Sequence, residues 1–72
     1  MLITYELTDG RHITGDEKDI LVVHPGIRLE INAWDIVEDA LKNGKCVINL
    51  AHVTHMHAPT DTDLDRYKVL GY

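Results

Sequence analysis

The sequence predicts a small α+β domain: a mostly antiparallel sheet with one helix packed on one face. Residues 2–8 and 27–31 alternate apolar and polar side chains, as half-buried strands do. Residues 32–43 instead repeat apolar side chains at the spacing of an amphipathic helix. The predicted order of elements is β-β-β-β-α-β, with room for a short sixth strand at the end.

The first two strands form a hairpin around Asp9-Gly10. A three-residue loop at 8–10, with Gly10 in the left-handed conformation, pairs Leu7 with Arg11 and Tyr5 with Ile13. A two-residue turn would put Ile13 on the wrong face of the sheet. We therefore predict the three-residue loop.

Residues 15–19 (GDEKD) are interpreted as a charged turn, and the apolar run 20–23 (ILVV) as a third strand buried on both faces. His24-Pro25-Gly26 ends this strand. The fourth strand, 27–31, is predicted to direct its apolar side chains inward. These are Ile27, Leu29 and Ile31.

The helix is predicted over Asn32–Asn43. Asn32 is a suitable N-cap, and Asn43-Gly44 is a suitable stop. Wound at helical spacing, the segment collects its apolar side chains on one arc: Ala33, Trp34, Ile36, Val37, Ala40 and Leu41. A hairpin turn at Asn43-Gly44 is the alternative, and we disfavour it because the alternation before it fails.

Residues 45–50 form the strand after the helix, with Cys46, Ile48 and Leu50 on one face. A short strand at 53–57 is expected after a tight turn. Residues 1–59 are interpreted as a single α+β domain, and residues 60–72 as a C-terminal linker and tail. For this tail a terminal helical turn, an edge strand and an interaction arm all stay open.

Composition narrows the classes of function. The chain has 72 residues, a net charge of −5, one Cys and no Phe, which predicts an aliphatic core without a disulfide. The lone Cys46 favours a reducing, cytoplasmic setting. The N-terminus resembles neither a signal peptide nor a membrane span. The acidic balance argues against nucleic-acid binding, which depends on Lys and Arg. No cofactor is predicted.

Three histidines lie close together in the sequence, at His52, His55 and His57. Strand geometry puts His55 and His57 on one face and His52 on the other. A metal site needs three or four ligands, so two imidazoles do not complete one. Binding of a metal or small ligand at the His55/His57 strand end is the alternative function.

No catalytic residues are predicted. Cys46 is flanked by apolar strand residues, where a thiol usually acts as a small core side chain. The carboxylate clusters within 16–19 and 35–39 are most simply a turn and a solvated face. Together with Asp61, Asp63 and Asp65 they give a further alternative, an acidic inhibitor that mimics DNA phosphate.

Two resemblances add to these interpretations. The hairpin LTDGRHITG resembles the first hairpin of Sm-like and SH3-like small barrels. More broadly, a strand, a D-G turn, a strand, one helix and the segment Ile48-Asn49-Leu50-Ala51-His52-Val53 resemble short hypothetical proteins of phages and prophages. This resemblance implies a small accessory or host-interaction protein and assigns no functional residue.

The sequence therefore predicts a non-enzymatic accessory protein that acts through protein contacts, as a homo-oligomer with a protein partner. Small chains without disulfides or structural metals commonly associate, because association buries more of their apolar surface. The predicted contact residues are apolar side chains of the tail that have no evident place in the core: Leu64, Tyr67, Val69, Leu70 and Tyr72.

Overall fold

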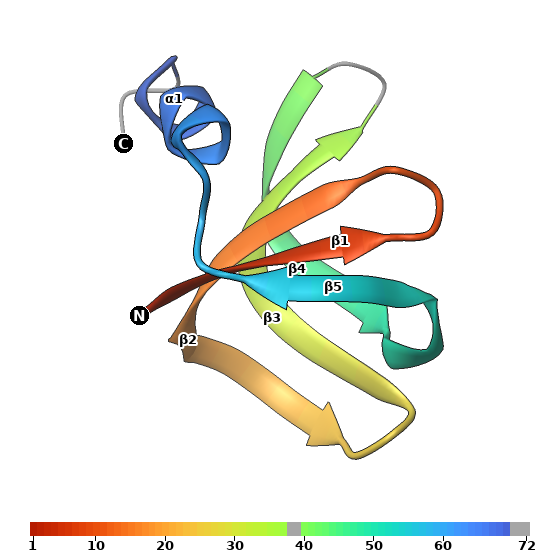
Figure 1. Ribbon diagram of the computed structural model, residues 1–72. Coiled ribbons are helices and arrows are strands. Elements are labelled where there is room, and N and C mark those ends of the chain that lie inside the picture. The colour runs from red at the N-terminus through yellow and green to blue at the C-terminus, as the bar shows by residue number, and fades with distance from the viewer. Residues whose placement is uncertain (38–39, 70–72) are drawn as a thin grey trace.

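The computed structural model describes residues 1–37 and 40–69, with side chains except at 36–37, 40–41 and 66–69. It shows one five-stranded antiparallel sheet and a C-terminal helix (Figure 1). The elements are β1 (Leu2–Leu7), β2 (His12–His24), β3 (Arg28–Val37), β4 (Ala40–Asn49), the 3₁₀ helix η1 (Leu50–His52), β5 (Val53–His57) and α1 (Asp61–Val69). The strand order is β4-β3-β2-β1-β5.

The mostly antiparallel sheet is confirmed, but the helix predicted over Asn32–Asn43 is wrong. This segment is the β3–β4 hairpin, in which Trp34 pairs with Asn43 and Val37 pairs with Ala40. The one α-helix of the described residues is α1, in the tail. Asp35 explains the error: it is buried, so a carboxylate occupies an inward strand position and hides the alternation of the segment.

The first hairpin has the predicted register. Tyr5 pairs with Ile13, and the Leu7 amide donates to the Arg11 carbonyl at 2.9 Å. Gly10 has a φ of 86°, the left-handed conformation that the three-residue loop requires.

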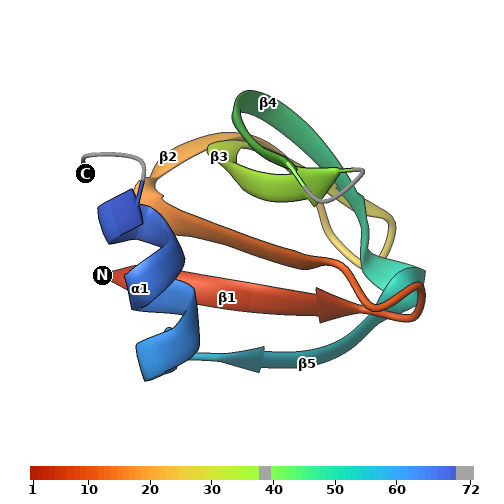
Figure 2. The same ribbon diagram turned by 90° about the horizontal axis from the view of Figure 1, so that it is seen from above.

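The charged turn predicted at 15–19 is also wrong, because β2 runs through this segment with an irregularity in its pairing to β3 between Gly15 and Ile20. Gly15 lies against the core: a Cβ atom there would be 2.9 Å from the Ala33 Cβ and 3.0 Å from the Ile31 Cδ1. The absence of a side chain lets β2 and β3 approach closely where the sheet curls (Figure 2).

The core lies on the inner face of the sheet and is aliphatic apart from one tyrosine. Among the described residues its buried apolar members are Tyr5, Ile13, Leu29, Ile31, Ala33 and Ile48. As predicted, Cys46, Ile48 and Leu50 face it, and Val47 does not.

The prediction that 20–23 is buried on both faces is wrong, since Leu21, Val22 and Val23 are exposed. Ile27 was predicted to point inward, and it is 66% exposed. β1 pairs with β2 only over residues 12–16. The part of the β2–β3 hairpin after residue 16, which we call its distal half, therefore extends beyond β1.

Candidate functional site

Three features outside the buried core could serve a function. One is a polar cluster where α1 meets β1. Another is an exposed aliphatic region on the distal β2–β3 hairpin and β4. The third is a pocket beside Trp34.

Asp63 fastens α1 to the sheet. The Thr60 amide donates to the Asp63 carboxylate at 2.9 Å, and the Asp63 amide donates to the Thr60 hydroxyl at 3.3 Å, which is a reciprocal helix cap. The Thr4 hydroxyl of β1 donates to the same carboxylate at 3.3 Å. Asp63 is only 4% exposed, so this one side chain of the predicted tail is buried against the sheet while its neighbours in the first turn are exposed.

Histidines surround the neighbouring carboxylate of Glu6. His12 lies between two acids, with Nδ1 at 3.2 Å from Asp63 and Nε2 at 3.0 Å from Glu6. Glu6 is also 3.2 Å from His57 Nε2 and 3.6 Å from His55 Nδ1. We call these five residues the histidine cluster.

Two pKa values in this cluster are displaced. Burial alone would raise the pKa of Asp63, but hydrogen bonds from Thr60 and His12 lower it below its ordinary value. The hydrogen bond between His57 and the Ala58 carbonyl raises the pKa of His57, and nearby Glu6 raises it further. The cluster therefore favours a charged carboxylate beside a charged imidazole.

The predicted pair His55 and His57 does share a face, and both reach Glu6. His12 joins them from β2, a neighbour that sequence reasoning did not place, and His52 lies apart in η1. Among the described residues, no group of three or more His, Cys, Asp or Glu side chains is placed to hold a metal ion. The geometry here is that of hydrogen bonds and ion pairs.

The second feature is a set of exposed aliphatic side chains that we call the aliphatic surface. Val22 and Val47 flank Glu30 across three neighbouring strands. Glu30 itself binds Lys45 at 2.7 Å and Arg28 at 3.8 Å, and the hydrogen bond from Lys45 lowers its pKa. The aliphatic surface comprises the exposed side chains at this end of the sheet: Leu21, Val22, Val23, Ile27 and Val47. Val22 and Val47 lie on the outer face, whereas Val23 pairs with Leu29 and lies on the inner face.

The structure describes only some of the tail residues that the sequence predicts to contact a partner. Leu64 is 36% exposed on α1. The backbones of Tyr67 and Val69 belong to α1, but their side chains lie outside the described set, and Leu70 and Tyr72 lie outside the described residues. The described part of the tail thus offers less exposed apolar surface than the β2–β3 hairpin.

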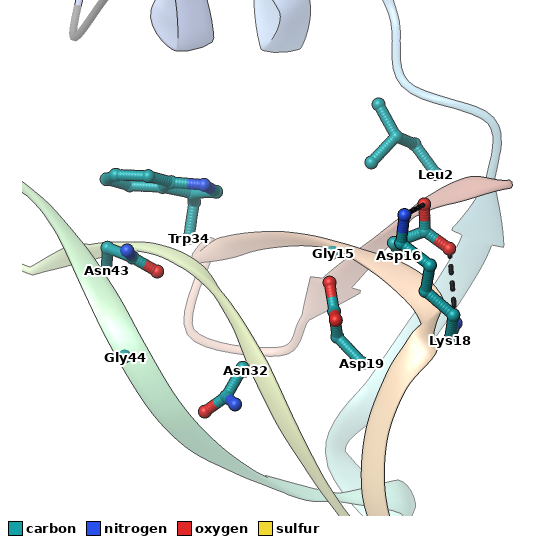
Figure 3. Close-up of a pocket in the computed structure, with 9 residues that line it drawn as sticks. All are labelled: Leu2, Gly15, Asp16, Lys18, Asp19, Asn32, Trp34, Asn43 and Gly44. Atoms are coloured by element: carbon teal, nitrogen blue, oxygen red, sulfur yellow. Dashed lines mark hydrogen bonds and ion pairs between the residues drawn. The ribbon is translucent and has the colours of Figure 1, made fainter. Parts of the chain in front are cut away.

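The third feature is a pocket of about 500 Å³ on the outer face, shown in Figure 3. The Trp34 ring forms one side, and Leu2 lies on the opposite side. The Lys18 backbone amide donates to Asp16 at 3.1 Å, and this hydrogen bond lowers the pKa of Asp16. The N-terminal amine at 3.1 Å and the Lys18 ammonium at 3.9 Å lower it further. The lining consists of Leu2, Gly15, Asp16, Lys18, Asp19, Asn32, Trp34, Asn43 and Gly44.

Cys46 and Asp35 lie on the inner face. Burial raises the pKa of Cys46, as does nearby Asp35, so the residue is held as a thiol rather than a nucleophilic thiolate. Asp35 accepts a hydrogen bond from Arg11 Nε at 3.1 Å and pairs with the guanidinium. This ion pair joins the start of β2 to β3 and is structural in character.

Comparison of the chain with family models, curated proteins and solved structures gave no match. In the part of the chain that the structure describes, none of the helical segments has the length and apolar character needed to cross a membrane.

Proposed function

We propose that this protein is a non-enzymatic protein-binding module that associates with a second copy of itself through the aliphatic surface. The observation that carries the proposal is the exposure of Val22 and Val47 on the outer face of neighbouring strands, with Leu21, Val23 and Ile27 also exposed at this end of the sheet. Several apolar side chains exposed at one end of a small protein are typical of a contact site.

The balance of buried and exposed apolar residues supports association. Among the described residues, six apolar side chains are buried in the core, while the aliphatic surface leaves five exposed. A small domain buries a limited fraction of its surface, and pairing two such faces increases that fraction. Ile27 and Val47 contribute most, at 66% and 57% exposure.

If two copies associate, charge favours contact through this region over contact through the more strongly charged remainder of the chain. Residues 20–32 and 42–49 contain Arg28, Lys42 and Lys45 against Glu30, a formal +2 within a chain of −5, which leaves −7 elsewhere. Two copies that meet through this region keep their acidic remainders apart. At the centre of the surface, Glu30 is already compensated by Lys45.

Native mass spectrometry over a dilution series tests the proposal, with Val22→Asp/Val47→Asp as the disrupting variant. Met56→Asp is the matched control, since Met56 is 58% exposed and Val47 is 57% exposed. We expect a dimer for the wild type and the control and a monomer for the double variant. A monomeric wild type at every concentration, or equal dissociation of the control, would contradict the proposal.

The same spectra address the remaining sequence-based hypotheses. A retained metal that disappears in His55→Ala/His57→Ala would support the ligand-binding alternative. A host-directed accessory role stays a prediction from the resemblance to phage proteins.

A further inference from the structure

We propose that two copies of the chain associate by pairing β4 with β4 of the second copy, antiparallel, across a two-fold axis at Val47. This inference rests on the proposed function, because it states how the aliphatic surface meets its copy. Among the described strands, β4 pairs with β3 alone and is therefore an edge of the sheet. Figure 2 shows β4 at one rim of the curled sheet.

The ladder between β3 and β4 shows which backbone groups face this edge. The Leu50 amide donates to the Ile27 carbonyl at 2.9 Å, and these two residues continue the register in which Ile48 lies opposite Leu29. Hydrogen-bonded pairs alternate with non-hydrogen-bonded pairs along an antiparallel ladder. The even-numbered residues of β4 therefore bond to β3. The odd-numbered residues before η1 direct their amides and carbonyls to the free edge: Lys45, Val47 and Asn49.

This row of backbone groups is complementary to itself. Each of its residues offers one N–H donor and one carbonyl acceptor. With the axis at Val47, the residue pairs with its own copy, and Lys45 pairs with Asn49 of the second copy. Every outward group of the three then has a partner. Such isologous pairing closes at a dimer, whereas pairing of β4 with the other edge, β5, would continue from copy to copy.

The side chains favour the same axis. On the outer face Val22, Glu30 and Val47 lie opposite one another on β2, β3 and β4. An axis at Val47, which is 57% exposed, brings the two valines into contact and continues this row into the second copy.

The charge of the edge is compatible with this pairing. Lysine on an edge strand usually discourages pairing, but the Lys45 ammonium is bound to Glu30 at 2.7 Å. An axis at Lys45 would place two like charges directly opposite each other, which is destabilising. An axis at Val47 instead places Lys45 opposite the neutral Asn49.

Proline at residue 49 tests the backbone pairing. Asn49 has a φ of −76°, which proline adopts, and its amide faces away from β3, so Asn49→Pro should keep the fold of the monomer. Asn49→Ala is the matched control, because both variants lose the side-chain oxygen that accepts from the Ala51 amide. Only the proline also loses the outward N–H. We expect the dimer dissociation constant, measured by analytical ultracentrifugation, to be about tenfold or more higher for Asn49→Pro, since each copy loses one hydrogen bond.

Cross-linking tests the register and does not depend on the proline variant. Directly opposed residues of a hydrogen-bonded pair have Cα atoms about 5.5 Å apart, within reach of a disulfide. Cys46→Ser/Val47→Cys should therefore form a disulfide-linked dimer in oxidised glutathione. Native Cys46 would lie diagonally across from its copy, at about 7–8 Å, and should cross-link several-fold less. Cys46→Ser/Met56→Cys is the matched control, since Met56 is 58% exposed on the other edge strand.

The outcomes separate this inference from the proposed function. A wild type that is monomeric at every concentration would overturn both. A wild-type dimer that Asn49→Pro and Asn49→Ala weaken equally would overturn the pairing of β4 and leave self-association standing. Cross-linking that is stronger through native Cys46 than in the Val47→Cys variant, or equal in the Met56→Cys control, would overturn the axis at Val47. Amide spectra of each variant confirm that the fold is retained.

Discussion

The two halves of the outer face have the same strand alternation, but the outward side chains are polar in one half and aliphatic in the other. Under α1, outward positions hold Thr4, Glu6 and His12, which bond to one another or to Asp63. On the distal β2–β3 hairpin and β4, outward positions hold Val22 and Val47, which stay exposed. The difference teaches that a covered sheet face can be polar when its covering element is fixed by hydrogen bonds, whereas the exposed aliphatic side chains are the basis of the proposed self-association.

Asp63→Ala should give the largest effect on the polar half. It removes the acceptor for Thr4 and Thr60 and the acid beside His12. We expect a loss of about 2–3 kcal/mol in the free energy of unfolding, measured with denaturant. Asp61→Ala, at an exposed site in the same turn, should cost less than about 1 kcal/mol. Equal losses would show that the cap does not fasten the helix.

Gly15→Ala tests the close approach of β2 and β3, which lies between the two halves of the sheet face. The added methyl group would meet the Ala33 Cβ at 2.9 Å, so we expect a loss of about 1–3 kcal/mol in the free energy of unfolding. The same substitution in an Ala33→Gly background should cost clearly less, because the clashing atom is gone. Additive costs in this double-mutant cycle would contradict the proposed close approach.

The histidine cluster should make the polar half sensitive to pH. The pKa of Asp63 is lowered, so its stabilisation holds above the ordinary carboxyl pKa and is lost as pH falls through the lowered value. The pKa of His57 is raised, so its stabilisation is complete below the ordinary imidazole pKa and is lost as pH rises through the raised value.

Stability should therefore be greatest between the ordinary carboxyl and imidazole pKa values, about pH 4.5 to 6. Thermal unfolding of the wild type should occur at a lower temperature at about pH 8 than at about pH 6. His57→Gln should reduce that difference. An identical pH dependence in wild type and variant would remove His57 from the explanation.

The smallest effect is expected on the aliphatic half. Val47→Thr should change the free energy of unfolding of the monomer by less than about 0.5 kcal/mol, because the side chain is largely exposed. Ile48→Val, at the buried neighbouring position, should cost about 1 kcal/mol. Denaturant unfolding at low protein concentration checks both. A large cost for Val47→Thr would mean that Val47 packs within its own chain.

The sequence predicted the local features of the fold and missed those set by distant contacts. The register of the first hairpin followed from Gly10 and from the alternation of Tyr5 and Ile13. The β3–β4 hairpin was mistaken for a helix because the burial of Asp35 depends on Arg11, which lies far away in the sequence. Apolar residues between 33 and 41 fit both a helix and two strands joined by a short turn.

For the site, the sequence contains one local pattern that the sequence analysis did not use. Thr60 and Asp63 have the spacing of a capping box, which predicts the start of α1. His55 and His57 were correctly placed on one face, but their meeting with His12 depends on β5 pairing with β1, which no local pattern reveals. The exposure of Val22 and Val47 likewise depends on the tertiary arrangement, which no local pattern reveals.

Two-dimensional amide NMR over a dilution series tests most directly whether the two halves differ in this way. We expect concentration-dependent shifts in residues 20–30 and 45–49, with β1, β5 and the start of α1 unchanged. Shifts centred on β5 or α1, or a spectrum that does not change with concentration and reports a monomer, would contradict it.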